Sequence, residues 1–279
     1  MSAISYRTRA SIKAYLEVFI ENLVEKYRKR NLPSVDGSTP YLKQKSSKGR
    51  LKPFHAAIIS PEMLRLNEFE RGFSTSLGTT FEECAKLIAF EHHREAHRSY
   101  DITGEVSQAA INEIERQIAI FEISSKSQRQ KPSLEEMIQS VFNARKDDDL
   151  VTRTSRADLY ILTKEGKHLF FEIKSPQPNK GQCFEVTQRL LRFHLLSAKN
   201  YPRVEAYYAM AYNNFGPNRS DYKNSLVKTY TPFDDSVIIG QEFWHIVGGE
   251  TAYEELLEIY EEVGREKSKY IIDALAFGF

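Results

Sequence analysis

Apolar residues at three- and four-residue spacing mark the start of the chain as a helix. The pattern covers 12–27, with charged residues between the apolar positions, as expected for a helix that packs by one face. Residues 31–53 then break the pattern with three prolines and two glycines. We expect a mobile basic loop there, either in contact with a phosphate backbone or solvated. Its cations are Lys43, Lys45, Lys48, Arg50 and Lys52.

Helix-start signals continue through the next hundred residues. A hydroxyl or carboxylate side chain at the first position of a helix accepts a backbone N–H, and proline suits the first turn. The expected starts are Ser60-Pro61, Thr79 or Thr80 after a turn at Gly78, residue 107, and the capping box from Ser133 to Glu136. Up to about residue 150 the chain is therefore expected to be almost entirely helical.

The pattern changes near residue 151. ADLYILT (157–163) alternates and is rich in strand formers, KEGK contains a turn glycine, and HLFFEIKS (168–175) follows as a second strand. The later elements are expected to be a helix over about 182–199, a strand over 204–212, a short strand over 236–240 and a charged helix from residue 251.

These elements predict an α/β fold in which helices flank a small mixed β-sheet. We expect a mainly helical region over 1–150 packed on a core over 151–279, as one continuous domain. With 279 residues the chain is long enough to bury a substantial core.

Composition restricts the class of protein but does not indicate a function. The formal net charge is +1, so nucleic acid binding would require cations to cluster on one surface. The two cysteines and the absence of a signal-like or membrane-spanning apolar stretch favour a reduced, cytoplasmic protein.

The strands at 157–174 carry the candidate chemistry. Side chains alternate faces along a strand, so Glu172 and Lys174 point the same way. Asp158, across the turn at Gly166, lies near the start of the preceding strand and can reach that face. Two carboxylates can hold Mg²⁺, which polarises a phosphate and lowers the pKa of a bound water. A lysine beside them can orient or deprotonate that water and offset developing charge.

An E-x-K spacing alone is weak evidence. A second copy, Glu165-Gly166-Lys167, lies in the turn and presents no strand face. The alternative for Glu172 and Lys174 is a surface hairpin whose charges pair in solvent. Two features favour a catalytic site over this alternative: the apolar strand directly before Glu172 and the position of Asp158 in its own strand.

The hairpin RADLYILTKEGKHLFFEIKSPQPNKGQ resembles the core of the PD-(D/E)XK nuclease superfamily. A wider likeness, over about 50–279, is to type II restriction endonucleases of the TdeIII type. It rests on FERGFSTSLGTTFEECAKLIA (69–89), FFEIKSPQPNKGQCFEVTQRLLR (170–192), AYYAMAYNNFGPNRSDY (206–222) and the terminal KSKYIIDALAFGF. One departure is Ala157 where the superfamily motif is named for a proline.

The resemblance implies a Mg²⁺-dependent endonuclease, with Mn²⁺ as a substitute ion. It implies that Asp158 and Glu172 hold the metal and that Lys174 positions the nucleophile, and Ile173 is counted with the metal-holding residues. A helix before the first core strand often supplies one more acidic group, for which Glu82 is the best candidate and Glu70 the rival. The alternative for Glu82 is an exposed glutamate that favours the helix dipole.

DNA contacts are expected after the catalytic strand and in the polar loop at 213–223. Arginine, asparagine and aspartate are residue types that read base edges, although a turn-rich surface loop has the same composition. The candidates are Lys180, Gln182, Gln188, Arg189, Asn213, Arg219 and Asp221.

The resemblance further suggests a short, GC-containing palindromic site in double-stranded DNA. A two-fold homodimer would then place one active site on each strand, and a cognate DNA methyltransferase would be the genetic partner. The competing hypotheses are a repair or structure-specific nuclease with the same core, a DNA-binding module without catalysis, and a purely structural helical protein.

Overall fold

The computed structural model describes residues 2–28, 53–127, 130–199, 201 and 203–277. The basic loop expected at 31–53 lies outside these residues except for Pro53. The chain divides into two compact units, one of residues 1–5 and 81–255 and the other of residues 6–80 and 256–279. Helices α3 (Pro61–His92) and α10 (Ala252–Ile272) contribute to both units.

The first unit is built on a five-stranded mixed sheet in the order β1-β2-β3-β4-β5. Its strands are β1 (Glu95–Ser107), β2 (Leu150–Leu162), β3 (His168–Ile173), β4 (Val204–Met210) and β5 (Val237–Ile239). Strand β2 runs antiparallel to both β1 and β3, whereas β3, β4 and β5 run parallel to one another. A parallel pair needs a crossover, and α6 (Lys180–Ser197) provides it between β3 and β4.

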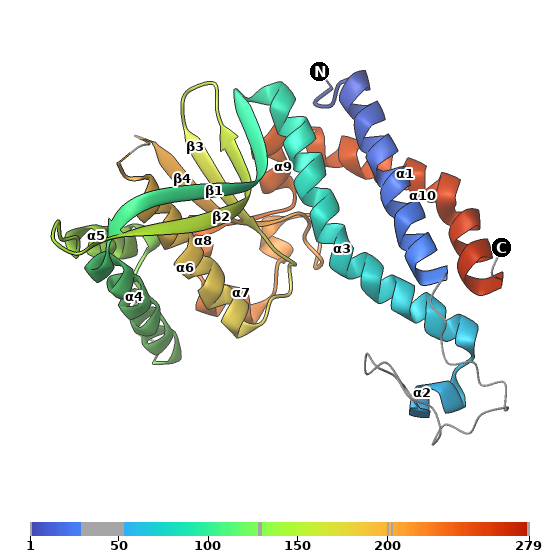
Figure 1. Ribbon diagram of the computed structural model, residues 1–279, viewed down its shortest axis with the longest axis horizontal. Helices are drawn as coiled ribbons and strands as arrows, with labels where there is room; N and C mark the ends of the chain where they lie inside the picture. Colours follow the sequence, from blue (N-terminus) through green and yellow to red (C-terminus); the bar gives the residue numbers. More distant parts are fainter. Residues whose placement is uncertain (1, 29–52, 128–129, 200, 202, 278–279) are drawn as a thin grey trace. The chain divides into compact units, whose positions relative to one another are not determined.

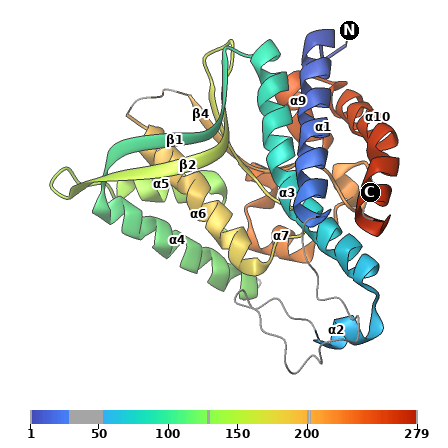
Figure 2. The ribbon, with the colours of Figure 1, turned by 45° about the vertical axis from the view of Figure 1, so that its right-hand side comes forward.

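Helices cover both faces of this sheet, as the α/β prediction requires. Figures 1 and 2 show α4 (Gln108–Lys126), α5 (Leu134–Asn143) and α6 gathered on one side. Their apolar residues form one core cluster with Tyr160, Phe170 and Tyr208 of the sheet. On the other side, Phe243 of α9 (Gln241–Gly248) packs against Phe171 of β3 with ring centroids 5.7 Å apart.

Short elements complete this unit after β4. They are the 3₁₀ turn η2 (Arg219–Asp221), α7 (Ser225–Tyr230) and α8 (Phe233–Ser236). The indole N–H of Trp244 donates to the carbonyl of Ala211 at 2.7 Å, which ties α9 to the end of β4.

The second unit is helical. It contains α1 (Tyr6–Arg28), α2 (Pro53–Ile58), the first part of α3, most of α10 and the π-helical η3 (Asp273–Phe277). The stripe predicted on the first helix is confirmed, because Ile12, Leu16 and Val24 of α1 are buried. Lys13 pairs with Glu262 and Glu266 of α10 at 2.6 and 2.7 Å.

The prediction of a helix start at Thr79 or Thr80 is wrong, because α3 runs unbroken through both residues and through Gly78. The threonine hydroxyls do not cap a helix. That of Thr79 donates to the carbonyl of Ser76 at 2.6 Å, and that of Thr80 donates to Leu77 at 2.7 Å. Bonding to the preceding turn lets threonine remain inside a helix.

Strand β1 is the one element of the sheet that the sequence patterns did not predict. It contains five charged or histidine residues in thirteen, EAHRSYDITGEVS, and most of its side chains are at least partly exposed. Twelve register pairs join it to β2, which begins seven residues earlier than expected. Pairing with β2 therefore holds a segment whose own hydrophobic pattern does not mark it as a strand.

Candidate active site

Glu172 is the most buried charged group of the predicted centre. It lies in β3 between Phe171 and Ile173, and only 1% of its side chain is exposed. Its neighbours on the strand are fully apolar, so the carboxylate needs positive partners to remain charged. Burial and the nearby charge of Asp158 raise the pKa of Glu172, and Lys174 and Arg189 oppose that rise.

Lys174 joins the two predicted carboxylates. It directly follows β3, and its ammonium forms ion pairs with Glu172 and, at 3.3 Å, with Asp158. Burial acts to lower the pKa of Lys174, but the charges of Asp158 and Glu172 outweigh it and raise the pKa above its ordinary value. The alternative of a solvated surface hairpin does not fit a cluster whose central carboxylate is inaccessible.

Asp158 lies where strands β2 and β3 separate. The pairing of β2 with β3 ends at Leu159 and Phe171. One residue further, the Asp158 carboxylate accepts the backbone N–H of Ile173 at 2.8 Å. The side chain thus takes the place of a backbone acceptor and is held toward the end of β3.

The second E-x-K copy lies where the sequence placed it. Gly166 has φ 79° in the turn between β2 and β3. Lys167 pairs with Glu205 at 2.7 Å on the surface, away from the buried carboxylate.

Arg189 of α6 also belongs to this cluster. Its guanidinium lies 2.9 and 3.0 Å from the two Glu172 oxygens and 3.0 Å from Glu185. The sequence suggested DNA contact for Arg189 and missed this pairing. A signal was present, because Val186 and Leu190 form the buried face of α6 and place Arg189 at its edge, toward the sheet.

Glu82 lies near the cluster but has a partner of its own. The Arg98 guanidinium on β1 donates to Glu82 at 2.9 Å and to Glu83 at 2.8 Å. Burial raises the pKa of Glu82 and the charge of Asp158 adds to it, against the hydrogen bond from Arg98. Among the described residues no three His, Cys, Asp or Glu side chains form a group that could hold a metal, so Glu82 is not gathered with Asp158 and Glu172 into one such group.

Comparison with known proteins identifies the family of the chain. A family model described as type II restriction endonuclease, HinfI, matches residues 9–264. The chain belongs to that family.

Individual members of the HinfI family are similar over almost the whole chain. The type II restriction enzyme HgiEI of Herpetosiphon aurantiacus is 47% identical over 273 residues, which cover 98% of this chain and 99% of that protein. HgiCII of the same organism is 48% identical over 268 residues, covering 96% and 97%. The sequence-based expectation of a type II restriction endonuclease, which acts on double-stranded DNA, is confirmed.

Lys180 and Gln182, both predicted to contact DNA, have partners within this HinfI-family chain. At the start of α6, the Lys180 ammonium lies 2.5 Å from Glu122 of α4. Gln182 completes a capping box with Asn179, and Gln188 is half-buried on the same helix. Contact of these residues with DNA stays a prediction, and for Lys180 it would require the ion pair to open.

The loop after β4 is stabilised by its own polar side chains. Asn213 donates to the carbonyl of Asn218 at 2.7 Å, and Asp221 accepts the Asn218 N–H at 2.9 Å. Arg219 donates to the carbonyls of Val237 and Phe233 and pairs with Glu242 at 2.8 Å. Base readout by this loop stays a prediction, and Arg219 would have to leave these partners to take part.

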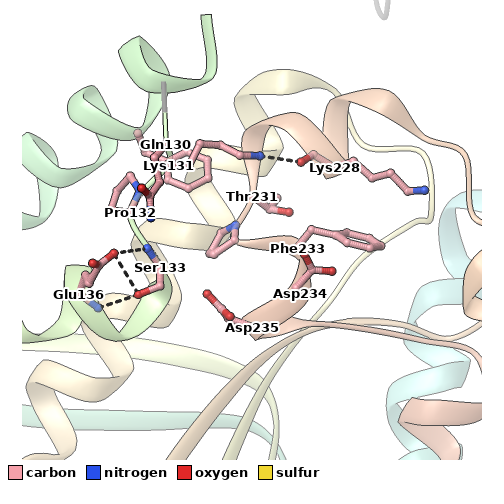
Figure 3. Close-up of a pocket in the computed structure, with 12 residues that line it drawn as sticks. Gln130, Lys131, Pro132, Ser133, Glu136, Lys228, Thr231, Phe233, Asp234 and Asp235 are labelled. Atoms are coloured by element: carbon pink, nitrogen blue, oxygen red, sulfur yellow. Dashed lines mark hydrogen bonds between the residues drawn. The ribbon is translucent and has the colours of Figure 1, made fainter. Parts of the chain in front are cut away.

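A pocket of about 590 Å³ lies elsewhere on the same unit, between the start of α5 and the α7–α8 segment (Figure 3). Several of the polar groups that line it have partners within the chain. Lys131 donates to the carbonyl of Lys228 at 2.9 Å, and Asp235 accepts the Leu134 N–H at 3.0 Å. None of the residues of the carboxylate cluster lines this pocket.

Two further observations concern the class of protein. Both cysteines, Cys84 and Cys183, are buried. In the described part of the chain, every helix is too short or too polar to cross a bilayer.

Proposed function

We propose that this restriction endonuclease cleaves DNA at a centre formed by Asp158, Glu172 and Lys174 with a divalent metal, Mg²⁺ or in its place Mn²⁺. The observation that carries the proposal is the contact of one ammonium, that of Lys174, with both carboxylates. A buried carboxylate and a lysine at the end of the otherwise apolar strand β3, with a second carboxylate beside them on β2, are a costly arrangement for folding alone.

The donor set fits a hard cation. Glu172 Oε1 is buried and makes no hydrogen bond of regular geometry among the described residues, although two charged nitrogens lie beside it. Asp158 would be the second carboxylate, and Ile173, whose side chain has no donor atom, could contribute only its carbonyl. Mg²⁺ accepts such a set because it binds few protein oxygens and keeps several waters.

When bound, the metal would supply positive charge to the scissile phosphate and acidify a water molecule. The chain's own residues would do the rest. Asp158 and Glu172 fix the position of positive charge at the end of β3. Lys174, held protonated between two carboxylates, offers a donor to the charge that develops on the phosphate oxygens.

Glu82 is proposed only as a conditional fourth member. Arg98 donates through two nitrogens to one Glu82 oxygen and would have to release it before Glu82 could approach Asp158. The contacts of Arg98 therefore favour a supporting role for Glu82 over direct metal binding.

For the substrate, we propose a short, GC-containing palindrome cut by a homodimer, with a cognate DNA methyltransferase protecting the host. A palindrome presents the same bases to two symmetric subunits, so a two-fold dimer meets both strands alike. The sequence-reading surface is proposed to include Gln182, Gln188 and the 213–223 loop, together with Lys180.

The test is cleavage of DNA of known sequence with Mg²⁺, followed by sequencing of the ends. The proposal expects one palindromic sequence at every cut and no cutting in EDTA. Cutting of branched or damaged DNA alone would replace it with a structure-specific nuclease. Light scattering of the protein with and without a site-bearing duplex would test the dimer.

A further inference from the structure

One backbone conformation in the nuclease unit departs from regular strand geometry. Ser99 of β1 has φ 49° and is the only non-glycine residue with positive φ in the part of the chain that is described. Such values are uncommon for residues other than glycine and disfavoured by the Cβ atom. Strain of this kind persists only where the surrounding structure imposes it, often near a functional site.

Ser99 lies directly across the sheet from Asp158. The register pairs Arg98 with Leu159 and Tyr100 with Ala157, but the intervening step, Ser99 with Asp158, is unpaired. On its other side, Asp158 has left β3, because that pairing ends at Leu159. Asp158 is therefore free of regular ladder pairing toward both neighbouring strands.

The side chains around this step show that β1 changes face there. His97 and Tyr100 both stack against the ring of Tyr160, at centroid distances of 6.1 and 4.2 Å. In a regular strand, residues three apart point to opposite faces. The left-handed residue between His97 and Tyr100 accounts for the switch.

Strand β2 shows the same change opposite Ser99. Ala157 and Tyr160, also three apart, belong to one core cluster, whereas Leu159 and Ile161 do not. Asp158 lies inside this switch, and its carboxylate reaches the Ile173 N–H and Lys174. The kink in β1 is thus matched to the step of β2 that carries the carboxylate.

We propose that Ser99 is a positioning residue for Asp158. Its left-handed backbone opens the β1–β2 ladder at a single step and lets Asp158 turn toward the end of β3. The proposal rests on the proposed role of Asp158. It assigns no contact with DNA or metal to Ser99, whose side chain is exposed, so the backbone conformation and not the hydroxyl is what matters.

The experiment compares substitutions at Ser99 that differ in their tolerance of positive φ. Glycine adopts it without steric cost and asparagine more readily than most residues, while alanine and especially valine resist it. We expect kcat to follow the order Gly and Asn, then Ala, then Val, with KM for DNA unchanged. For Ser99→Val the expected loss in kcat is about 100-fold, the scale of a misplaced reacting group.

Mn²⁺ binding without DNA gives a second readout, measured by calorimetric titration. Ser99→Val should weaken it by about tenfold, as changes behind a metal ligand do, while Ser99→Gly should match wild type. Thr103 is the matched control, exposed on the same strand and paired regularly with Thr154. At this regular strand position the preference is the opposite one: Thr103→Val should be tolerated, and Thr103→Gly should destabilise the strand.

Equal kcat and equal Mn²⁺ affinity across Gly, Ala and Val would overturn the proposal. So would a loss in Ser99→Gly as large as in Ser99→Val, because the hydroxyl would then be the essential group. If Ser99→Val does not fold, kcat and Mn²⁺ affinity are compared between Ser99→Asn and Ser99→Ala instead, and equal values would overturn the proposal. Wild-type protein that binds no Mn²⁺, together with a fully active Asp158→Asn, would instead refute the proposed metal centre.

Discussion

Arg189→Met tests how the buried carboxylate of the centre is balanced. The guanidinium contacts both oxygens of Glu172 at 2.9 and 3.0 Å. The Glu172 side chain is 1% exposed and that of Arg189 is 28% exposed. Methionine keeps much of the aliphatic length of arginine and removes the charge, so the substitution isolates the electrostatic contribution.

The magnitude follows from what remains beside Glu172. Removing one partner of a buried ion pair costs about 3–5 kcal/mol when the other charge is left alone. Here Lys174 stays in contact with Glu172, so we expect roughly half of that, about 2 kcal/mol of unfolding free energy. The additional pair with Glu185, which is 58% exposed, contributes less than about 1 kcal/mol.

The assay is urea unfolding at neutral pH without divalent ions. Arg192→Met, an exposed arginine on the same helix, is the control and should change stability by less than about 0.5 kcal/mol. Mg²⁺ should restore part of the unfolding free energy lost in Arg189→Met, because the bound ion would supply positive charge beside Glu172 in place of the missing guanidinium. Arg189 would not balance the Glu172 charge if Arg189→Met unfolds like wild type, or if Glu172→Gln leaves the cost of removing Arg189 unchanged.

Three further predictions concern positions outside the carboxylate cluster. A Cβ at Gly248 would lie 2.3 Å from the Ile88 side chain, so Gly248→Ala should lower the free energy of unfolding by about 1–3 kcal/mol through overpacking, and with it the melting temperature. Gly264 in α10 has open space around it, so Gly264→Ala should raise stability by about 1 kcal/mol through helix propensity, and the reverse order would contradict both. Although burial opposes it, hydrogen bonds from Thr251 and the first residues of the chain lower the pKa of Glu255 to about 2. Its stabilisation, about 1–2 kcal/mol after allowance for exposure, should be present above pH 4.5 and disappear as the pH falls toward 2. Urea unfolding of Glu255→Gln should thus differ from wild type at pH 7 and converge with it in acid.

Local patterns predicted much of the fold. The stripe on α1, the capping box at Ser133 and the hairpin of β2 and β3 are all present. Strand β1 escaped prediction because its residues are held by pairing with β2 and are mostly not buried. The unbroken α3 escaped because threonine and glycine, typical of helix ends, are tolerated inside a helix whose other residues favour it.

The residues of the carboxylate cluster also differ in how far the sequence predicts their positions. Glu172 and Lys174 are two residues apart, so strand alternation alone places them on one face, and the ion pair between them agrees. Asp158 could not be placed by alternation, because β2 changes face at that step and β3 has separated from it. The periodicity of α6 places Arg189 at the edge of its buried face, but the contact with Glu172 depends on how α6 packs on the sheet, which local patterns do not determine.

Single-turnover cleavage of a site-bearing duplex by Lys174→Ala in Mg²⁺ tests whether Lys174 acts at the active site. We expect a fall in rate of at least about 100-fold, the scale for one lost charged donor, with DNA affinity retained. Lys167→Ala is the control, because Lys167 belongs to the other E-x-K sequence and pairs with Glu205 on the surface. It should cut like wild type. An unchanged rate for Lys174→Ala, or an equal loss for Lys167→Ala, would contradict a centre built from Asp158, Glu172 and Lys174.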